Sequence, residues 1–349
     1  MNKEKKKLCD CIDGDIIAED VFNHLGIALV IKNTILNKYI SDKLLDLGIK
    51  EIYIYQKDNN PYDDMIYDSD DKVEYSYYQS FLNLKQLINE LTINHSIEYK
   101  LLTDISNEIF HCLHNVSSII RCLSEIKNTD EYTYYHSLNV AFYAMLLAKW
   151  LNFSDEETKD VIKAGLLHDI GKTQISNEIL NKKGKLNEDE FEIIKKHCIY
   201  GYETIKNITG LKAEIVDAVR HHHERVDGSG YPDHLRGKEL GQFSKIIAIV
   251  DVYDAMTQNR VYKDKVTPFD SFKMFLTIGI SNYDSKILFT FLNNLSAYYA
   301  GTKVVLSDGQ IGEIAYVPPQ DIAYPIIAID SKYIDLSRER ELKILRLEL

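Results

Sequence analysis

The sequence is poor in cysteine, proline and glycine, with 5, 6 and 16 of these residues among 349. So little glycine and proline excludes a collagen-like or low-complexity chain, and a hydrophobic fraction of 45% excludes intrinsic disorder. The cysteines are odd in number and show no disulfide framework, so we expect reduced thiols and a cytoplasmic protein. The longest apolar runs, such as residues 25–31, fall far short of the roughly 20 residues of a membrane span, and no signal segment follows the N-terminal lysines.

Positive charge is also scarce, since 41 lysine and arginine residues face 53 aspartate and glutamate residues. The formal net charge of −12 repels a polynucleotide, and no cluster concentrates the basic residues. We therefore expect neither a long nucleic acid nor a membrane as a partner.

The order of local patterns predicts a mainly α-helical protein with a small module at each end. Residues 1–60 mix short apolar runs with one amphipathic helix and predict a small α/β unit, and residues 61–74 predict a linker. Helical periodicity dominates residues 75–297, the predicted helical body. Residues 298–349 predict a β-rich module. Its expected strands are residues 304–306, 311–317 and 326–329.

Histidines and carboxylates gather where these predicted helices end. A capping box at Ser154 opens a helix that ends at His168 and Asp169, just before a glycine that lets the chain turn. A second capping box, at Asn187, opens a helix that we expect to carry His197. The arrangement predicts that histidines from separate helices meet.

Further candidate ligands lie on three other helices. His136 falls on the apolar face of residues 135–151, and the helix that begins near Lys212 ends in a histidine triplet. Residues 245–256 are almost wholly apolar except for Asp251 and Asp254, so at least one carboxylate must be buried. Buried carboxylates and imidazoles are costly unless they are paired or bind metal, so we expect one shared site. Imidazole and carboxylate donors without thiolate suit iron, manganese, zinc or nickel in a hydrolytic centre.

Five ordered motifs carry a specific resemblance. They are His168-Asp169-Ile170-Gly171-Lys172, His197, His222-His223-Glu224, Asp227-Gly228-Ser229-Gly230-Tyr231-Pro232 and Asp251-Val252-Tyr253-Asp254-Ala255-Met256. Over residues 99–295 they resemble the HD-GYP family of cyclic di-GMP phosphodiesterases. The resemblance implies a helical HD-type domain around two, sometimes three, metal ions. It also implies hydrolysis of cyclic di-GMP to pGpG, or on to GMP, in bacterial second-messenger signalling.

The same resemblance implies a role for individual residues. The metal ligands would be His136, His168, Asp169, His197, His222, His223 and Asp251. Asp169 would bridge two divalent ions, for which iron or manganese is expected, and would serve catalysis together with Lys172. Lys172, Arg260 and Lys263 match phosphate-contacting positions. The residues of the substrate-side loop would be Gly230, Tyr231 and Pro232.

The sequence departs from the family pattern at three places. Members with a third metal carry a glutamate one turn before the first histidine, but here that position is Tyr132, so a binuclear site is favoured. The family's Arg-Pro-Tyr is Arg260-Val261-Tyr262 in this chain. His221 extends the histidine pair to a triplet, and because successive helical residues are about 100° apart, all three cannot face one centre.

Several hypotheses stay open at this stage. The chain is expected to be an enzyme, but a catalytically silent cyclic di-GMP receptor and a phosphodiesterase for another cyclic dinucleotide, such as cyclic GMP-AMP, are the alternatives. A homodimer is a further expectation. The cluster of His95, His111, Cys112 and His114 lacks the paired spacing of structural zinc sites, so we do not expect a second metal there.

Overall fold

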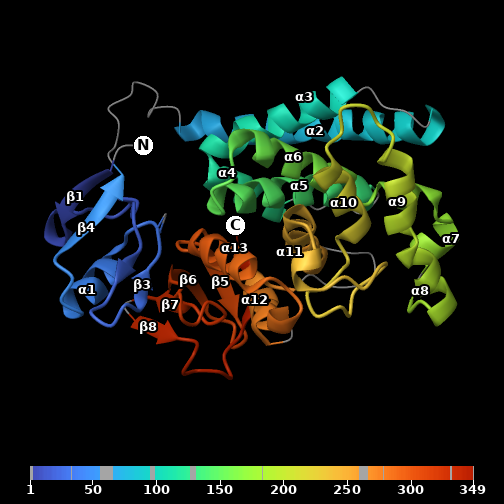
Figure 1. Ribbon diagram of the computed structural model, residues 1–349. Coiled ribbons are helices and arrows are strands. Elements are labelled where there is room, and N and C mark those ends of the chain that lie inside the picture. Colours follow the sequence, from blue (N-terminus) through green and yellow to red (C-terminus); the bar gives the residue numbers. More distant parts are fainter. Residues whose placement is uncertain are drawn as a thin grey trace. The chain divides into compact units, whose positions relative to one another are not determined.

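The computed structural model in Figure 1 describes residues 3–32, 34–55, 66–94, 99–125, 131–182, 184–258, 266–277, 279–330 and 332–348. The chain divides into two compact units. One comprises Ile66–Val266 and Phe275–Leu288, and the other comprises Met1–Met65, Thr267–Met274 and Phe289–Leu349. The predicted class, a mainly helical protein with small β-containing modules at the two ends of the chain, is confirmed.

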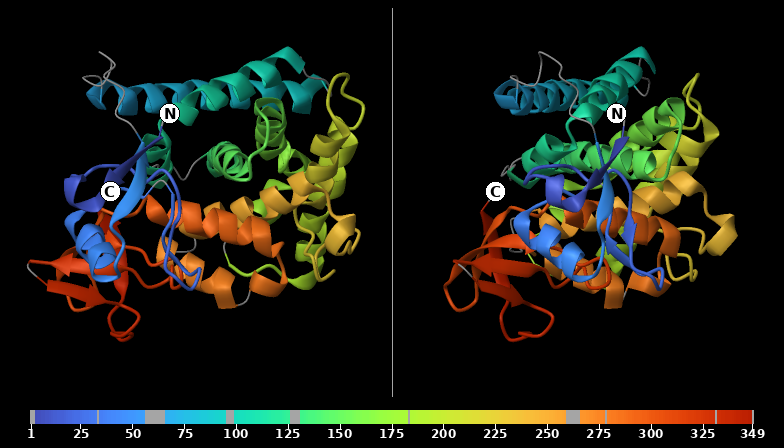
Figure 2. Two further views of the ribbon diagram at one scale, coloured as in Figure 1. Left: turned by 60° about the vertical axis from the view of Figure 1, so that its left-hand side comes forward. Right: turned by 90° about the vertical axis from the view of Figure 1, so that its left-hand side faces the viewer.

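The first unit is built from helices. They are α2 (Ile66–Asn94), α3 (Tyr99–His111), α4 (Val116–Glu125), α5 (Tyr132–Trp150), α6 (Asp155–Leu167), α7 (Asn177–Leu180), α8 (Glu188–Lys195), α9 (His197–Ile205), α10 (Ala213–His221) and α11 (Gln242–Thr257). Every residue of α5 from His136 to Ala148 is buried, as expected for a helix that is apolar on all sides. It contacts α2, α6 and α11, and α2 lies beside α3 in the views of Figures 1 and 2. Thus α5 is the central helix of this unit.

Helix α2 begins earlier than the sequence predicts. It starts at Ile66, within the stretch of residues 61–74 that predicts a linker. Val73, Tyr77, Phe81 and Leu84 are buried at helical spacing and attach one face of α2 to the unit. Tertiary burial of that face offsets the weak helical pattern of the acidic residues at its start. Residues 61–65 of the predicted linker lie outside the described residues, and the three domain boundaries stay predictions.

The second unit combines both ends of the chain. Its N-terminal part contains β1 (Lys3–Lys7), β2 (Val21–Phe22), β3 (Ala28–Val30), α1 (Lys38–Asp46) and β4 (Glu51–Tyr55). β1 pairs antiparallel with β4, and β2 pairs with β3. Asn37 caps α1 through the backbone N–H of Ile40 and also donates a hydrogen bond of 2.6 Å to the carbonyl of Ala315. The N-terminal part therefore contacts the C-terminal module directly.

The C-terminal module is a five-stranded antiparallel sheet. The strands are β5 (Lys303–Leu306), β6 (Ile311–Tyr316), β7 (Ile326–Ile329), β8 (Lys332–Asp335) and β9 (Ile344–Glu348), in the order β8-β7-β6-β5-β9. The three predicted strands are present, and β8 and β9 complete the sheet. Two helices, α12 (Pro268–Thr277) and α13 (Ser285–Ala297), contribute residues to both units.

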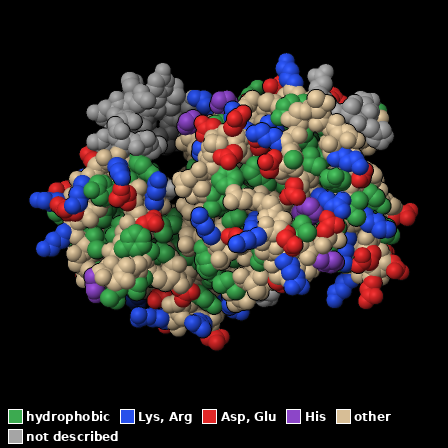
Figure 3. Space-filling view, in the orientation of Figure 1, with side chains coloured by type: hydrophobic (Ala, Val, Ile, Leu, Met, Phe, Trp, Pro, Cys, Tyr) green, Lys and Arg blue, Asp and Glu red, His purple; other side chains and the backbone are tan. Residues whose placement is uncertain are grey.

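The distribution of charged side chains and the character of the helices agree with the expectations drawn from the composition. On the face shown in Figure 3, acidic and basic side chains are interspersed over the helical unit. Among the described helices, none has the length and apolar character needed to cross a membrane.

Candidate metal centre

A tight turn at the end of α6 places two of the predicted ligands. The capping box between Ser154 and Glu157 fixes the start of α6, His168 is its C-cap, and Asp169 precedes a 3₁₀ turn, Ile170–Gln174. This turn packs directly on α9, because a Cβ atom at Gly171 would lie 1.9 Å from the carbonyl oxygen of His197. Only glycine permits this approach, which brings His168 and Asp169 beside His197.

Three of the imidazoles each contact a backbone carbonyl through Nδ1. The Nδ1 atom of His168 lies 2.7 Å from the carbonyl of Gly165, that of His197 lies 2.6 Å from the carbonyl of Ile194, and that of His222 lies 3.0 Å from the carbonyl of Val219. Because a carbonyl oxygen can only accept a hydrogen bond, Nδ1 carries the proton in the neutral form of each imidazole. Each Nε2 therefore carries a lone pair. Such backbone contacts fix the tautomer of metal-binding histidines.

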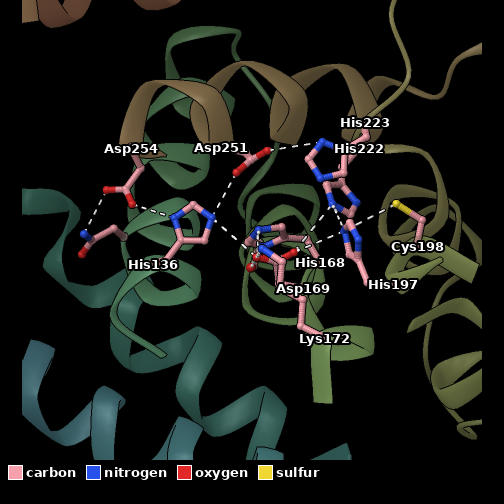
Figure 4. A network of polar contacts seen from close by, with 12 residues as sticks. His136, His168, Asp169, Lys172, His197, Cys198, His222, His223, Asp251 and Asp254 are labelled. Carbon is pink, nitrogen blue, oxygen red and sulfur yellow. Dashed lines mark hydrogen bonds and ion pairs between the residues drawn. The ribbon is translucent and has the colours of Figure 1, made fainter. Parts of the chain in front are cut away.

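The carboxylate of Asp169 lies in the middle of this group (Figure 4). Its Oδ2 is 3.6 Å from Nε2 of His136 and 3.3 Å from Nε2 of His168. Its Oδ1 is 3.4 Å from Nε2 of His197 and 3.9 Å from Nε2 of His222. The two oxygens therefore face two different pairs of imidazoles, an arrangement suited to a carboxylate shared by two cations.

Asp251 of α11 is the second carboxylate of the centre and lies between His136 and His223. Its Oδ1 lies 3.0 Å from Nε2 of His136, and its Oδ2 lies 3.7 Å from Nδ1 of His223. His221 turns away and contacts Asp217 and Asp233 instead, each at 2.8 Å. The expected register of the triplet, with His222 and His223 inward, is therefore the one observed.

The donor set fits divalent metal ions. His168 Nε2 and Asp169 Oδ1 are fully buried, and the described part of the chain offers neither atom a hydrogen-bond partner. Burying such groups without a partner is costly, whereas a cation would satisfy both. Among the residues that the structure describes, three groups of potential donors have ligand atoms within 4.8 Å of one another: His136 with His168 and Asp251, His168 with Asp169 and His222, and His197 with Cys198, His222 and His223.

The electrostatics keep the two carboxylates ionised. Burial alone would raise the pKa of Asp169, but the Lys172 ammonium and the His168 imidazole outweigh it and hold that pKa well below its usual range. Burial is likewise outweighed at Asp251, whose pKa is held well below its usual range by the hydrogen bond to His136. Both groups present negative charge at neutral pH.

Most of the imidazoles are kept neutral. Burial lowers the pKa of His197 to about 4, and burial together with neighbouring imidazoles lowers the pKa values of His222 and His223 well below the usual range. Neutral imidazole is the form that binds metal ions. The pKa of His136 is raised to about 9, because hydrogen bonds to Asp251 and Asp254 outweigh the effect of burial.

The predicted substrate-side residues are only partly described. Lys172 is about a quarter exposed, and its ammonium group contacts Oδ2 of Asp169. Arg260 and Lys263 lie outside the described residues. Of the predicted phosphate contacts, the structure therefore places only Lys172 at the centre.

The loop that contains Gly230 borders the centre. A Cβ at Gly230 would lie 2.4 Å from Cα of Glu224, so the loop approaches the end of the histidine triplet more closely than any larger residue allows. The ring of Tyr231 lies 4.8 Å from the ring of His223, and a cis peptide bond joins Tyr231 to Pro232. The predicted loop is thus adjacent to His223, one of the predicted metal ligands.

The position expected to distinguish two metals from three carries no carboxylate. The ring of Tyr132 stacks on that of His136 with centroids 5.6 Å apart. The carboxylate of the preceding residue, Glu131, pairs with Lys85 of α2. An aromatic ring therefore stands where members of the family with a third metal carry a glutamate.

Two residues of the centre were not assigned a role from the sequence. Asp254 accepts a hydrogen bond from His136, and its three-residue spacing from Asp251 on one helix was the available signal. Cys198 lies next to His197, and its sulfur points toward the imidazoles in Figure 4. Elsewhere, His111, Cys112 and His114 line a separate cavity of about 460 Å³, and His95 lies outside the described residues.

Comparison with known proteins agrees with the geometry. Residues 115–287 match the HD domain family. This segment holds all seven predicted metal ligands. The resemblance drawn from the motifs is thereby confirmed.

Characterised relatives and a solved structure extend this comparison. The chain is 31% identical over 228 residues to cyclic di-GMP phosphodiesterase PA4108 of Pseudomonas aeruginosa, covering 65% of this chain and 55% of that protein. It is 36% identical over 171 residues to 3'3'-cGAMP-specific phosphodiesterase 1 of Vibrio cholerae, covering 49% and 39%. The chain thus matches 55% of the length of the first relative and 39% of the second. The structure of Bd1817, an HDG"Y"P protein from Bdellovibrio bacteriovorus, has a TM-score of 0.54 at 13% identity and covers 84% of this chain and 99% of its own, so the two share a fold.

Proposed function

We propose that this protein is a metal-dependent phosphodiesterase that hydrolyses cyclic di-GMP to linear pGpG, or on to GMP. The observation that carries the proposal is the buried Asp169 carboxylate, whose two oxygens face different pairs of imidazoles. The substrate class is supported by the names of the relatives in Pseudomonas and Vibrio, which act on cyclic dinucleotides.

Two divalent metal ions, iron or manganese, belong to the proposal. The residues that would hold them are His136, His168, Asp169, His197, His222, His223 and Asp251. When bound, such ions polarise a phosphodiester and lower the pKa of water toward neutrality. The neutral imidazoles of His197, His222 and His223 and the two ionised carboxylates supply nitrogen and oxygen donors that these metals accept.

The chain's own residues would orient the substrate. Lys172 would contribute a positive charge beside the scissile phosphate, and Arg260 and Lys263 would contact the phosphates as well. Tyr231, next to His223, would contact the bound dinucleotide from the loop. Precise positioning of the phosphate by such groups lowers the barrier to hydrolysis.

The direct test is turnover by protein purified without oxygen and reloaded with iron or manganese. We expect cyclic di-GMP to be converted to pGpG, detected by product chromatography, and no conversion by the Asp169→Ala variant. Binding of cyclic di-GMP without product over excess metal would instead show a silent receptor.

A phosphodiesterase for cyclic GMP-AMP is the second candidate, because one relative is named as specific for that dinucleotide. Comparing kcat/KM for the two substrates on the same preparation distinguishes them. A cytoplasmic location and a homodimer complete the proposal. The location is supported by the five cysteines, all of which are free thiols.

A further inference from the structure

The sequence predicted a centre of imidazole and carboxylate donors without thiolate, but one cysteine lies inside the cluster of donors. Cys198 follows His197 at the start of α9, and its side chain is 0% exposed. Its Sγ atom lies 3.5 Å from Nε2 of His197. It also lies within 4.8 Å of donor atoms of His222 and His223.

The two neighbouring imidazoles show that something positive belongs between them. Nε2 of His197 lies only 3.2 Å from Nε2 of His222. Because the Nδ1 atoms of both rings face backbone carbonyls, both Nε2 atoms carry lone pairs, and these lone pairs oppose each other at close range. A shared cation removes that repulsion.

Two of the separations in this group match those of atoms bound to one ion. At metal–nitrogen distances near 2.0–2.1 Å and a metal–sulfur distance near 2.3 Å, tetrahedral angles separate two nitrogens by about 3.3 Å and nitrogen from sulfur by about 3.6 Å. The observed separations are 3.2 Å between His197 and His222 and 3.5 Å between His197 and Cys198. The sulfur is therefore placed as a ligand would be.

The geometry points to Cys198 as a thiolate ligand of the metal ion held by His197, His222 and His223. The inference rests on the metal centre of the proposed function. It means that the two metal-binding positions of that centre differ in their donor atoms. On binding, the sulfur–metal bond replaces the S–H bond, and the proton is released to solvent. The position with sulfur would favour softer ions such as zinc or iron, whereas His136, His168 and Asp251 offer only nitrogen and oxygen.

Cobalt(II) titration of the chelator-treated full chain tests the inference, because a thiolate bound to cobalt gives a near-ultraviolet charge-transfer band that nitrogen and oxygen donors do not give. We expect this band in the wild type and its loss in Cys198→Ser and Cys198→Ala. The variants should bind one cobalt ion at least about tenfold more weakly, the lower end of what even an indirect partner of a ligand contributes. Zinc should lose its preference over manganese at that position by a similar factor.

Cys112→Ser is the matched control, since Cys112 is also a buried thiol of the helical unit but lies outside the cluster. It should keep the band, and circular dichroism of the metal-free variants should show that all of them fold. Normal cobalt uptake without the band, or a band that persists in Cys198→Ala, overturns the thiolate ligand and leaves the metal centre standing. Absence of cobalt uptake by the wild type overturns the metal centre and the thiolate ligand together.

Discussion

Nδ1 of His136 lies 2.7 Å from Oδ2 of Asp254, and both residues are buried. The other oxygen of Asp254 accepts a 2.9 Å hydrogen bond from the side-chain amide of Asn139, whose carbonyl accepts a 2.6 Å hydrogen bond from the Tyr77 hydroxyl. This chain of contacts links a predicted metal ligand to helix α2. It places the proton of Nδ1 toward Asp254, so that Nε2 faces Asp169 and Asp251 of the centre.

Asp254→Asn should therefore weaken metal binding. Asn139 would bond to the new carbonyl, so the new amide would face Nδ1 of His136 and drive the imidazole proton onto Nε2, the atom that must bind metal. We expect metal affinity to fall by about 10- to 100-fold, as measured by competition with a chelator of known affinity. Asp160→Asn is the matched control, because Asp160 is a buried carboxylate on α6 that pairs with Lys163. This variant should leave the metal affinity unchanged. Unchanged affinity in Asp254→Asn would contradict the orienting role.

Asp169 provides a second test through metal stoichiometry. Asp169→Ala removes both oxygens that face the two imidazole pairs, so we expect loss of hydrolysis and of more than one metal ion per chain. Asp169→Asn keeps one oxygen and should retain more metal than the alanine variant. Elemental analysis of both variants measures the effect, and two ions retained in Asp169→Ala would show that this carboxylate is not a bridge.

Local signals in the sequence predicted where α6 and α8 begin. The expectation that one helix runs from Asn187 through His197 is wrong, because α8 ends at Lys195 and His197 begins a separate helix, α9. The capping boxes predicted at Ser154 and Asn187 are both present, because they depend on contacts within four residues. The ordered motifs predicted which side chains gather, since the same motifs define a known arrangement. Their roles as ligands stay predictions that the variants above test.

Other features depend on distances that no local pattern contains. β1 consists of charged residues, Lys3–Lys7, and forms a strand because β4 pairs with it some fifty positions later. That pairing supplies hydrogen bonds where apolar alternation is lacking. Cys198 and Asp254 likewise acquire their positions only when α9, α5 and α11 come together, so the sequence showed the residues but not their contacts.

The loop beside the centre is held by Asp233. Its carboxylate accepts two hydrogen bonds from Arg220, at 2.6 and 2.9 Å, and contacts His221 at 2.8 Å. Asp233→Ala removes these contacts, so the loop that carries Tyr231 should become less ordered and KM should rise several-fold. Metal content should stay normal, because Asp233 is not among the donors. The control is Asp189→Ala, which removes an exposed carboxylate of α8 and should change neither KM nor metal content. An unchanged KM in Asp233→Ala would show that the loop does not contact substrate.

Lys172 separates substrate binding from metal binding. Lys172→Met keeps the length of the side chain and removes the charge that contacts Asp169, so metal content should stay normal. A charged contact is worth about 1.5–3 kcal/mol, so kcat/KM should fall by roughly one to two powers of ten. A rise in KM alone would show that Lys172 binds the ground-state phosphate, whereas a fall in kcat alone would show that it acts only in the transition state. Lys172→Arg, which retains the charge, should recover part of the activity. Full activity in Lys172→Met would remove this residue from the site, and loss of metal would show that its charge instead maintains the ligand geometry around Asp169.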